Sequence, residues 1–431
     1  MSSLLKNFVL LVFLSLTLMN PAVAGANQLQ QLLEDADRNN PSLKAALEQI
    51  AVAETKIAQV TSLNDPVLSI ALSNYPYDEF TTNVSPMTGN EFRLAQMFPF
   101  PGKLDAKGEI AAKQSRWFAA AYQDSRLQVR QQVKDAWFRL LFQRRAIELT
   151  NNNMKIIDDF IKLTEARYEV GKGLQQNVLK AHLQRSKQLD MLLSLQQNEA
   201  ATLAELNSLA GYETDRPLEI DGELEEVETT YVLSELQQQA EQDRPMFAAF
   251  AALIEQYKTQ RQLAELDYKP DFTVWAGYRW RDDALGDGGT DFLSAGISFN
   301  LPIRKARRSA AVAEADSSLR LAYQKRNEFR NKVNLAIHRS LSQLEQTGQL
   351  VNLYQGGIIP QANQTFQATL SAYQVDKVDF LDLLDSVMSL YRYEIDYARA
   401  LSDQQRSRAQ LESAAGLDAD QLKSLPQSDE G

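Results

Sequence analysis

The chain contains no cysteine and only two histidines, His182 and His338. Without cysteine it can form no disulfide framework, no cysteine-ligated metal site and no lipid-modified N-terminal cysteine. The histidines fall in different halves of the sequence, and we interpret each as an ordinary surface or packing residue of a helix. The eight methionines form no cluster along the sequence. Residues that ligate soft metal ions are therefore scarce, and the sequence predicts neither a resident metal ion nor a cofactor.

Positive charge is also in short supply, since 45 lysines and arginines stand against 56 aspartates and glutamates for a formal net charge of −11. That balance argues against nucleic acid as a partner. No catalytic arrangement of Ser, His and Asp and no glycine-rich phosphate loop is recognisable, so we do not expect an enzyme. The Asp- and Gly-rich stretch 281–291 has some features of a calcium loop, but its spacing fits no EF-hand. We interpret it as a loop between strands.

The two ends of the chain carry predictions of their own. Residues 1–24 have the pattern of a secretory signal peptide, with Lys6 ahead of an apolar stretch and small residues at the cleavage site. The apolar stretch, 8–19, is too short for a membrane anchor, which needs about 20 residues. We therefore expect the mature protein to begin at Gly25 and residues 417–431 to form a polar C-terminal tail.

The sequence repeats itself at a spacing of about 204 residues. Matching residues mark the two copies: Pro41 and Pro245, Pro66 and Pro270, Tyr168 and Tyr373. Each copy has a helix that starts at proline, a pair of extended segments, a turn with proline and a basic residue, and a long helical stretch. We predict a first repeat at 25–223 and a second at 224–416. Repetition on this scale indicates a symmetric scaffold before it indicates an enzyme.

Long helices dominate the prediction, because no glycine or proline occurs between Gly108 and Gly171. Apolar side chains recur there at steps of three and four residues, which is typical of a coiled-coil seam. The second repeat has the same pattern. We predict one long helical hairpin in each repeat, at about 106–209 and 303–415.

The hairpins have predicted tips and predicted kinks. The tips lie in matching motifs that include Gly171 and Lys172 in the first hairpin and Asp376 in the second. Three consecutive asparagines at 151–153, and a glycine pair with a proline at 356–360, occupy equivalent places in the outgoing helices. We predict a kink or a short side structure at both places.

Four short segments show the alternation of apolar and polar residues that is typical of strands: 67–75, 91–98, 272–280 and 292–300. Their lengths suit strands that cross a membrane, although a half-buried soluble hairpin gives the same pattern. Four strands cannot close a membrane barrel, which needs about eight, and lipid tolerates no open edge. If these strands lie in a membrane, several chains must share one barrel. Trp275, Trp280, Tyr278 and Tyr75 are candidates for an aromatic belt at the membrane interface, although ordinary strand packing explains them almost as well.

Three motifs occur in a fixed order along the chain: Asn39-Asn40-Pro41, the stretch QMFPFPGK at 96–103, and the paired hairpin tips. With the duplicated spacing they resemble the outer-membrane efflux protein family, the TolC-like exit ducts of Gram-negative bacteria. The resemblance implies a fold that is mainly α with a shared β-barrel. Three identical protomers would each give four strands to one twelve-stranded barrel, and their helices would continue it as a tunnel across the periplasm. It also implies an outer-membrane location, contact with outer-membrane lipid, and two partners, a periplasmic adaptor (membrane fusion) protein and an inner-membrane pump.

Residues 85–89, Ser-Pro-Met-Thr-Gly, are similar to the branch of that family that accompanies heavy-metal cation pumps of the resistance-nodulation-division class. We therefore expect a passive exit duct in a tripartite efflux system for heavy-metal cations. Drug efflux and type I protein secretion remain alternatives, because the pump selects the cargo. A soluble periplasmic coiled-coil adaptor would also have hairpins and a signal peptide, but it leaves the four amphipathic strands unexplained.

Two aspartates at the second tip match a family pattern at the periplasmic entrance of the duct. The stretch LDLLD at 381–385 has the residue types of the family's Val-Asp-Val-Leu-Asp. By this resemblance Asp382 and Asp385 would form two rings of carboxylates that narrow the pore of a trimer. Such rings repel one another and attract cations.

The resemblance also implies a gating latch, because family members restrain opening with a tyrosine and an arginine bonded to polar partners on neighbouring helices. Tyr373 matches the tyrosine. The arginine position falls on Val378 and its acidic partner on Asn177, so the latch is only partly kept. We expect Lys377, next to Val378, to substitute for the arginine.

Overall fold

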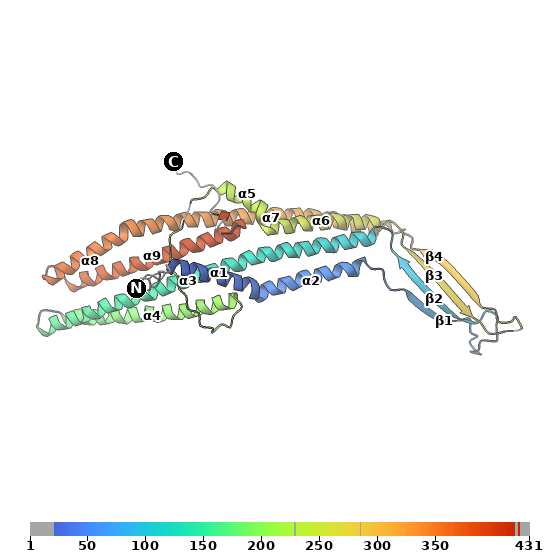
Figure 1. Ribbon diagram of the computed structural model, residues 1–431, viewed down its shortest axis with the longest axis horizontal. Coiled ribbons are helices and arrows are strands. Elements are labelled where there is room, and N and C mark those ends of the chain that lie inside the picture. Colours follow the sequence, from blue (N-terminus) through green and yellow to red (C-terminus); the bar gives the residue numbers. More distant parts are fainter. Residues whose placement is uncertain (1–20, 228–229, 285, 419–420, 423–431) are drawn as a thin grey trace, which may run out of the picture. The chain divides into compact units, whose positions relative to one another are not determined.

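The computed structural model describes residues 21–227, 230–284, 286–418 and 421–422. Most of the expected signal peptide, and most of the expected tail, lie outside the described residues. The helices are α1 (Pro21–Asn39), α2 (Pro41–Thr61), α3 (Lys103–Glu169), α4 (Gln175–Leu209), α5 (Leu233–Asp243), α6 (Pro245–Leu266), α7 (Lys305–Leu353), α8 (Ile359–Gln374) and α9 (Phe380–Ala415). A π-helix, η1 (Tyr354–Ile358), joins α7 to α8, and the strands are β1 (Val67–Ser73), β2 (Gly89–Phe98), β3 (Phe272–Trp280) and β4 (Phe292–Phe299). Figure 1 shows this order along the chain.

The two predicted repeats are confirmed at the level of secondary structure. Each repeat has helices, then two antiparallel strands, then a long helical hairpin, which is α3–α4 in the first and α7–α8–α9 in the second. The kink predicted at 151–153 is wrong, because α3 runs without a break for 67 residues through those asparagines. The interruption predicted at 356–360 is present as η1. Within the described part of the chain, no helix combines the length and the apolar character needed to cross a membrane.

The chain divides into two compact units, and each unit draws segments from both repeats. The first unit holds the chain up to Lys44, residues Asp124–Arg244 and the chain from Arg330 onward. It therefore contains α4, α5, η1, α8, α9 and most of α3. The second unit holds Ala45–Gln123 and Pro245–Phe329, which include the four strands and α6.

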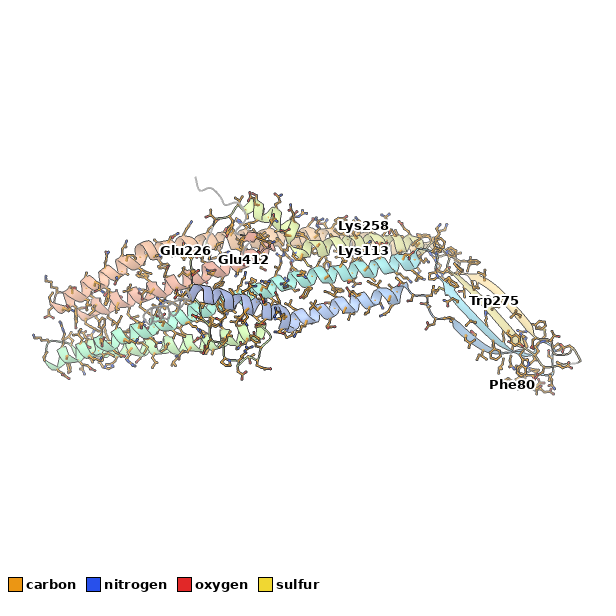
Figure 2. All side chains as sticks on the ribbon, in the orientation of Figure 1. Phe80, Lys113, Glu226, Lys258, Trp275 and Glu412 are labelled. Atoms are coloured by element: carbon orange, nitrogen blue, oxygen red, sulfur yellow. The ribbon has the colours of Figure 1, made fainter. Side chains whose placement is uncertain are left out.

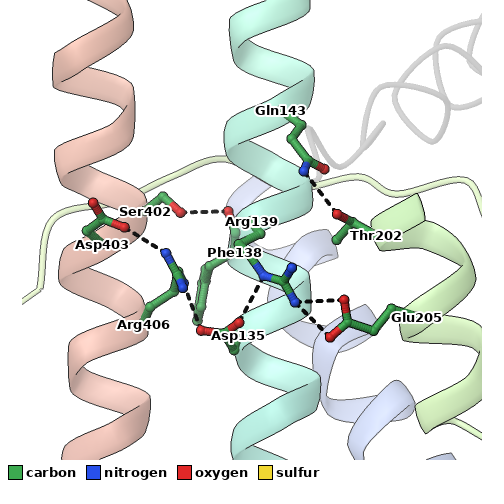
Figure 3. A network of polar contacts seen from close by, with 9 residues as sticks. All are labelled: Asp135, Phe138, Arg139, Gln143, Thr202, Glu205, Ser402, Asp403 and Arg406. Carbon is green, nitrogen blue, oxygen red and sulfur yellow. Dashed lines mark hydrogen bonds and ion pairs between the residues drawn. The ribbon is translucent and has the colours of Figure 1, made fainter. Parts of the chain in front are cut away.

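In the first unit a chain of ion pairs ties α3 to its neighbours (Figure 3). Asp135 of α3 accepts hydrogen bonds from Arg139 (Nε to Oδ2, 2.9 Å) and from Arg406 of α9 (Nε to Oδ1, 2.8 Å). Arg139 in turn reaches both oxygens of Glu205 on α4, at 2.8 and 2.9 Å. Alternating charges therefore link three helices at one level of the hairpins, where Asp135 is only partly solvated and Glu205 is exposed.

The segment between the repeats is fastened to the same region of the first unit. The buried side chain of Gln404 on α9 accepts from the N–H of Val227 (3.1 Å) and donates to the carbonyl of Val227 (3.0 Å). Arg144 of α3 donates to the carbonyl of Ile220 at 2.6 Å. These helix side chains therefore satisfy backbone N–H and C=O groups of the linker that have no backbone partner.

The second unit is built on one antiparallel sheet with the order β1-β2-β3-β4. The register pairs Phe98 with Phe272 and Phe272 with Phe299, so the ends of three strands carry adjacent aromatic rings. Where β2 leads into α3, the buried Lys103 pairs with Asp271 (2.9 Å) and Asp267 (3.1 Å). This contact explains the basic residue of the QMFPFPGK stretch, since Lys103 joins the first repeat to the start of β3.

Candidate functional site

The tips of both hairpins lie in the first unit and are built by the same kind of turn. Gly171 follows α3 with a φ of +72°, and the N–H of Lys172 reaches the carbonyl of Arg167 at 2.8 Å. Asp376 follows α8 with a φ of +57°, and the N–H of Lys377 reaches the carbonyl of Ala372 at 2.9 Å. Glycine takes the left-handed conformation freely, and aspartate is among the few other residues that tolerate it. The predicted tip residues Gly171, Lys172 and Asp376 are all exposed in these turns.

One arginine connects the two tips. The guanidinium of Arg167, in the last turn of α3, lies 4.3 Å from the centroid of the Tyr373 ring on α8. It also donates to the carbonyl of Tyr373 (3.1 Å) and pairs with Asp376 (2.5 Å). Sequence reasoning missed Arg167, although its place in the last turn of a long helix marks it as a cation near a helix C-terminus. One side chain of the first hairpin thus makes three contacts with the tip of the second.

The predicted latch residues have different surroundings. Tyr373 is buried, and burial raises the pKa of its phenol while the charge of Arg167 opposes that shift. Within the described residues, the side chains of Lys377 and Asn177 make no hydrogen bond or ion pair. Val378, which stands where the family has arginine, packs against the apolar cluster around Phe380. A role for Lys377 and Asn177 in the latch stays a prediction.

Aromatic side chains pack next to the contact between Arg167 and Tyr373. The fully buried ring of Phe380, at the start of α9, lies 6.1 Å from Phe160 of α3 in an edge-to-face arrangement. It lies 6.1 Å from Tyr373 as well. Pairs of this kind contribute about 0.5–1.5 kcal/mol each beyond the burial of their area. Tyr373 therefore contacts both a cation, Arg167, and an aromatic ring, Phe380.

The carboxylates at the start of α9 divide into two kinds. Asp379 caps the helix, because its Oδ1 accepts from the N–H groups of Leu381 (2.7 Å) and Asp382 (3.1 Å). Asp382 and Asp385 are exposed, and neither carboxylate has a hydrogen bond or an ion pair within the described residues. Three residues apart on a helix, they occupy neighbouring positions on one face. The two aspartates of the predicted constriction are thus the ones whose carboxylates have no partner among the described residues.

A groove of about 730 Å³ runs between α4 and α9, with Asp385 and Met388 among its lining residues. The sulfur of Met388 receives the amide groups of Gln184 (3.2 Å) and Asn153 (3.6 Å). Thioether sulfur is a weak hydrogen-bond acceptor. At this level, close to the tips, the polar contacts between α9 and the first hairpin are therefore weak.

In the second unit the sheet has two chemically different faces. One face is apolar and open, formed by alternate residues of all four strands, among them Leu68, Ile70, Leu72, Leu94, Tyr278, Trp280, Leu293, Ile297 and Phe299. Leu293 is 82% exposed. A contiguous apolar surface of this extent marks a membrane or protein contact rather than a surface made for water.

The opposite face of the sheet is polar. Glu91 of β2 pairs with Arg279 of β3 at 3.1 Å. Beside them the guanidinium of Arg93 stacks 3.9 Å above the ring of Trp275, which Figure 2 labels on the sheet. The candidate aromatic belt therefore needs one correction, because Trp275 is on the charged face while Tyr278 and Trp280 are on the apolar one. The strand period places them so, since residues at even and odd positions point to opposite faces.

The loop 281–291 is organised around a buried arginine. Arg281 pairs with Asp287 (2.9 Å), and its N–H donates to Asp291 (3.0 Å). Backbone N–H groups of Gly289 and Ala284, and then Arg281, hold the pKa of Asp287 below its usual range. In the described residues no three His, Asp or Glu side chains gather as metal ligands. Both histidines are exposed on helices, His182 on α4 near Glu165 and His338 on α7.

Helical hairpins that end in bare carboxylates, and a sheet with one open apolar and one charged face, are the parts of a membrane-channel subunit. The sequence model of the outer membrane efflux proteins matches residues 32–212 and 236–417, one match in each repeat. The chain therefore belongs to the outer membrane efflux protein family. It is a channel component of an efflux system in the outer membrane, and its helices extend into the periplasm.

Individual proteins similar to the chain agree with this assignment. The cobalt-zinc-cadmium resistance protein CzcC of Cupriavidus metallidurans is 22% identical over 403 residues, which cover 91% of each chain. The outer membrane protein VceC of Vibrio cholerae has a similar structure, with a TM-score of 0.75 and 20% identity over 90% of this chain and 96% of that one. The CmeC outer membrane channel of Campylobacter jejuni gives a TM-score of 0.75 with 14% identity, covering 90% and 85% of the two chains. These structural likenesses concern the fold.

Proposed function

We propose that three copies of this chain form one closed barrel and act as the exit duct of a tripartite efflux system for heavy-metal cations. The observation that carries the proposal is the sheet of the second unit. Its order leaves β1 and β4 with one unpaired edge each, while its apolar face is open. Lipid cannot satisfy the N–H and C=O groups of a free edge, so further copies must pair with β1 and β4.

The charged face of the sheet supports the same arrangement. When such a sheet closes with its apolar face toward lipid, Glu91, Arg93 and Arg279 line the inside. A water-filled interior tolerates these charges, and their pairing with each other and with Trp275 keeps them ordered. A soluble adaptor would have no use for this division of faces, and that alternative is disfavoured.

The entrance of the duct is proposed at the hairpin tips. Asp382 and Asp385 supply the constriction, because they are the exposed carboxylates on the first turns of α9. Arg167 supplies the latch together with Tyr373, since it holds the second hairpin to the first through a ring and a carbonyl. In a trimer, three copies of each carboxylate would face one axis and favour cations over anions.

The outermost tip residues are proposed as the docking surface for the periplasmic adaptor. Val170 and Leu174 in the first tip and Val375 in the second are each more than 60% exposed. Exposed apolar side chains that cluster in this way mark a contact surface for another molecule. An adaptor with a complementary apolar end would bury them, and the inner-membrane pump would complete the assembly.

Heavy-metal cargo is proposed from the likeness to CzcC, whose name concerns cobalt, zinc and cadmium resistance, together with the carboxylate entrance. Loss of the gene should make the host more sensitive to Co²⁺, Zn²⁺ or Cd²⁺, and the intact gene should restore resistance. Sensitivity to drugs alone, with metal resistance unchanged, would assign the duct to drug efflux instead.

The channel itself is tested with purified protein in planar bilayers. The protein should run as a trimer that dissociates on heating, and it should conduct with a preference for cations. Asp382→Asn combined with Asp385→Asn should reduce that preference, measured as a shift of the reversal potential across a salt gradient. Glu345→Gln, which removes an exposed charge of α7 outside the tips, is the matched control and should leave the potential in place. A water-soluble monomer that never inserts into lipid would refute the proposal.

A further inference from the structure

The chain is acidic overall, yet the stretch that joins the last strand to the next helix is strongly basic. Residues 304–308, Arg-Lys-Ala-Arg-Arg, follow β4 and lead into α7, and the next acidic residue is Glu314. The first turn of α7 holds no acidic residue. Because the positive end of the helix dipole disfavours cations, this composition costs α7 stability rather than adding to it. The basic stretch therefore has its explanation outside the helix.

The equivalent stretch of the first repeat uses its charges inside the protein. Lys103 is buried in ion pairs beside the start of β3, and Asp105 lies in the first turn of α3. In the second repeat, Arg304, Lys305 and Arg307 are exposed. Within the described residues their side chains make no hydrogen bond and no ion pair. The same turn thus carries a structural cation in one repeat and three unused cations in the other.

A fourth cation and an aromatic ring lie beside this stretch. Arg308 is turned toward the protein, where its Nε donates to the carbonyl of Asp267 at 2.5 Å. The two residues that follow Asp267 in the chain, Tyr268 and Lys269, are both exposed. The contact of Arg308 therefore brings the basic stretch next to a further lysine and to a tyrosine, a residue enriched where membranes meet water.

The apolar face of the sheet continues beyond β4 up to the first of these cations. Phe299, the last residue of β4, is exposed on that face. Leu301 and Ile303 follow at every second position and are 75% and 77% exposed. Arg304 comes directly after them. A surface that changes from apolar to cationic within one residue fits the boundary between lipid tails and anionic headgroups.

We infer that this junction binds anionic phospholipids of the periplasmic leaflet through a basic rim, formed by Lys269, Arg304, Lys305 and Arg307. The inference rests on the proposed function, because a membrane-spanning sheet puts the junction at the membrane surface. The helices extend into the periplasm, so this end of the strands meets the periplasmic leaflet. The rim contacts lipid phosphates while the apolar side chains at 301 and 303 reach the acyl chains. Each basic group close to an anionic membrane surface raises binding about fivefold.

Lipid binding to the intact protein tests the rim without reference to transport. The full-length protein in dodecyl maltoside is titrated with dioleoylphosphatidylglycerol or with dioleoylphosphatidylcholine, and native mass spectrometry counts the lipids that stay bound. The wild type should prefer phosphatidylglycerol. Arg304→Gln combined with Lys305→Gln and Arg307→Gln should weaken phosphatidylglycerol binding at least tenfold and leave phosphatidylcholine binding unchanged. Arg308 is kept in this variant because it holds the junction together.

The matched control removes three exposed cations from the same helix. Arg320→Gln, Lys325→Gln and Arg339→Gln make the same change of charge, and the nearest of them lies about 20 Å along α7 from Arg307. This control should keep the lipid preference of the wild type. A control that loses the preference as fully as the rim variant would mean that net charge, not the rim, selects the lipid, which overturns the inference.

The rival occupant of the rim is an acidic segment of a neighbouring copy, for which the exposed Asp65 ahead of β1 is the candidate. In that case the wild type would bind both lipids alike, and the rim variant would dissociate at a lower temperature in lipid-free detergent. That result overturns the inference and leaves the proposed channel intact. A protein that stays a water-soluble monomer and binds neither lipid overturns the proposed function, and the rim with it.

Discussion

The outgoing helices of the two hairpins carry breaker residues at equivalent places, yet only the second one breaks. In the first, three asparagines at 151–153 continue as regular helix within α3. In the second, the glycine pair at 356–357 falls in a π-helical turn. The difference has two sources. Pro360, four residues after Gly356, has no N–H to donate to the Gly356 carbonyl. The packing also differs. α3 is held by α4 through Arg144 and Glu199 (2.9 Å) and by α9 through Thr150 and Tyr391, whereas η1 has no buried residue.

The same contacts explain how asparagine is tolerated in α3. Asn153 is buried, and its amide finds a partner in the sulfur of Met388, while Asn151 and Asn152 remain exposed. Helix propensity is a weak preference that tertiary contacts override. The asparagines therefore leave α3 helical, because α3 packs against α4 and α9. The glycine pair lies in a segment with no buried residue, and there the α-helix is interrupted.

Disrupting the ion pairs that hold the C-terminal end of α9 to α3 should have the largest effect on stability. Glu412 of α9, labelled in Figure 2, is buried and forms ion pairs with Lys134 of α3 and with Arg408 (3.3 Å). Glu412→Gln leaves two cations without their counter-charge in a poorly solvated place. We expect a loss of about 3 kcal/mol of stability, seen as a lower thermal midpoint of the protein in detergent.

Lys134→Met is the matched comparison, because Arg408 still neutralises Glu412 when Lys134 is absent. It should cost clearly less than Glu412→Gln. Equal losses for the two variants would mean that Arg408 does not share the carboxylate. If neither variant changed the midpoint, these ion pairs would contribute nothing measurable to the packing of α9 on α3.

Much of this architecture could be predicted from the sequence because its signals are periodic and repeated. Steps of three and four residues indicate the hairpins, alternation indicates the strands, and β3 begins and ends at the predicted 272 and 280. The predicted kink in α3 was wrong because composition shows residues that disfavour a helix, but it does not show the contacts with α4 and α9 that keep this helix regular. The sides of the sheet follow from the period once the register is known, as the position of Trp275 demonstrates.

The candidate site was harder to predict because it depends on contacts between the repeats. The bare carboxylates of Asp382 and Asp385 fit the prediction, but Asp379 looks identical in sequence and is used as a helix cap. Arg167 was missed since its partners lie more than 200 residues away along the chain, at Tyr373 and Asp376. The sequence prediction placed the latch cation at Lys377, in the turn that follows α8. The structure has its cation on α3 instead, so the same two hairpins are joined from the other side.

Removing the arginine that connects the two tips should have the second-largest effect. Arg167→Ala removes a charged hydrogen bond to a carbonyl, a cation–π contact and an ion pair whose partner, Asp376, is largely exposed. The exposed ion pair contributes little, and the other two contacts together amount to about 1.4 kcal/mol, or about a tenfold rise in the open fraction. Single-channel recording measures that fraction. Arg167→Lys keeps the charge but not the planar stack, and should fall between the wild type and Arg167→Ala.

Tyr373→Phe separates the ring from the hydroxyl of the latch. The ring is the part that contacts both Arg167 and Phe380, so the phenylalanine variant should open only slightly more than the wild type. Tyr373→Ala should open as readily as Arg167→Ala. A phenylalanine variant that opens as freely as the alanine one would transfer the restraint from the ring to the hydroxyl.

The smallest effect is expected in the middle of α9, at Glu394. Glu394 is half-buried there, and burial raises the pKa of its carboxyl, opposed in part by Arg145. An acid whose pKa is raised by folding stabilises the fold fully below its unfolded pKa of about 4.3, and that stabilisation is lost as pH rises through the folded pKa. Glu394→Gln imitates the protonated acid at every pH. The variant should therefore exceed the wild type in thermal midpoint at neutral pH, with the gap closing toward pH 4. A gap that widened on acidification would mean that Glu394 is stabilised as a carboxylate, with the charge of Arg145 outweighing the effect of burial.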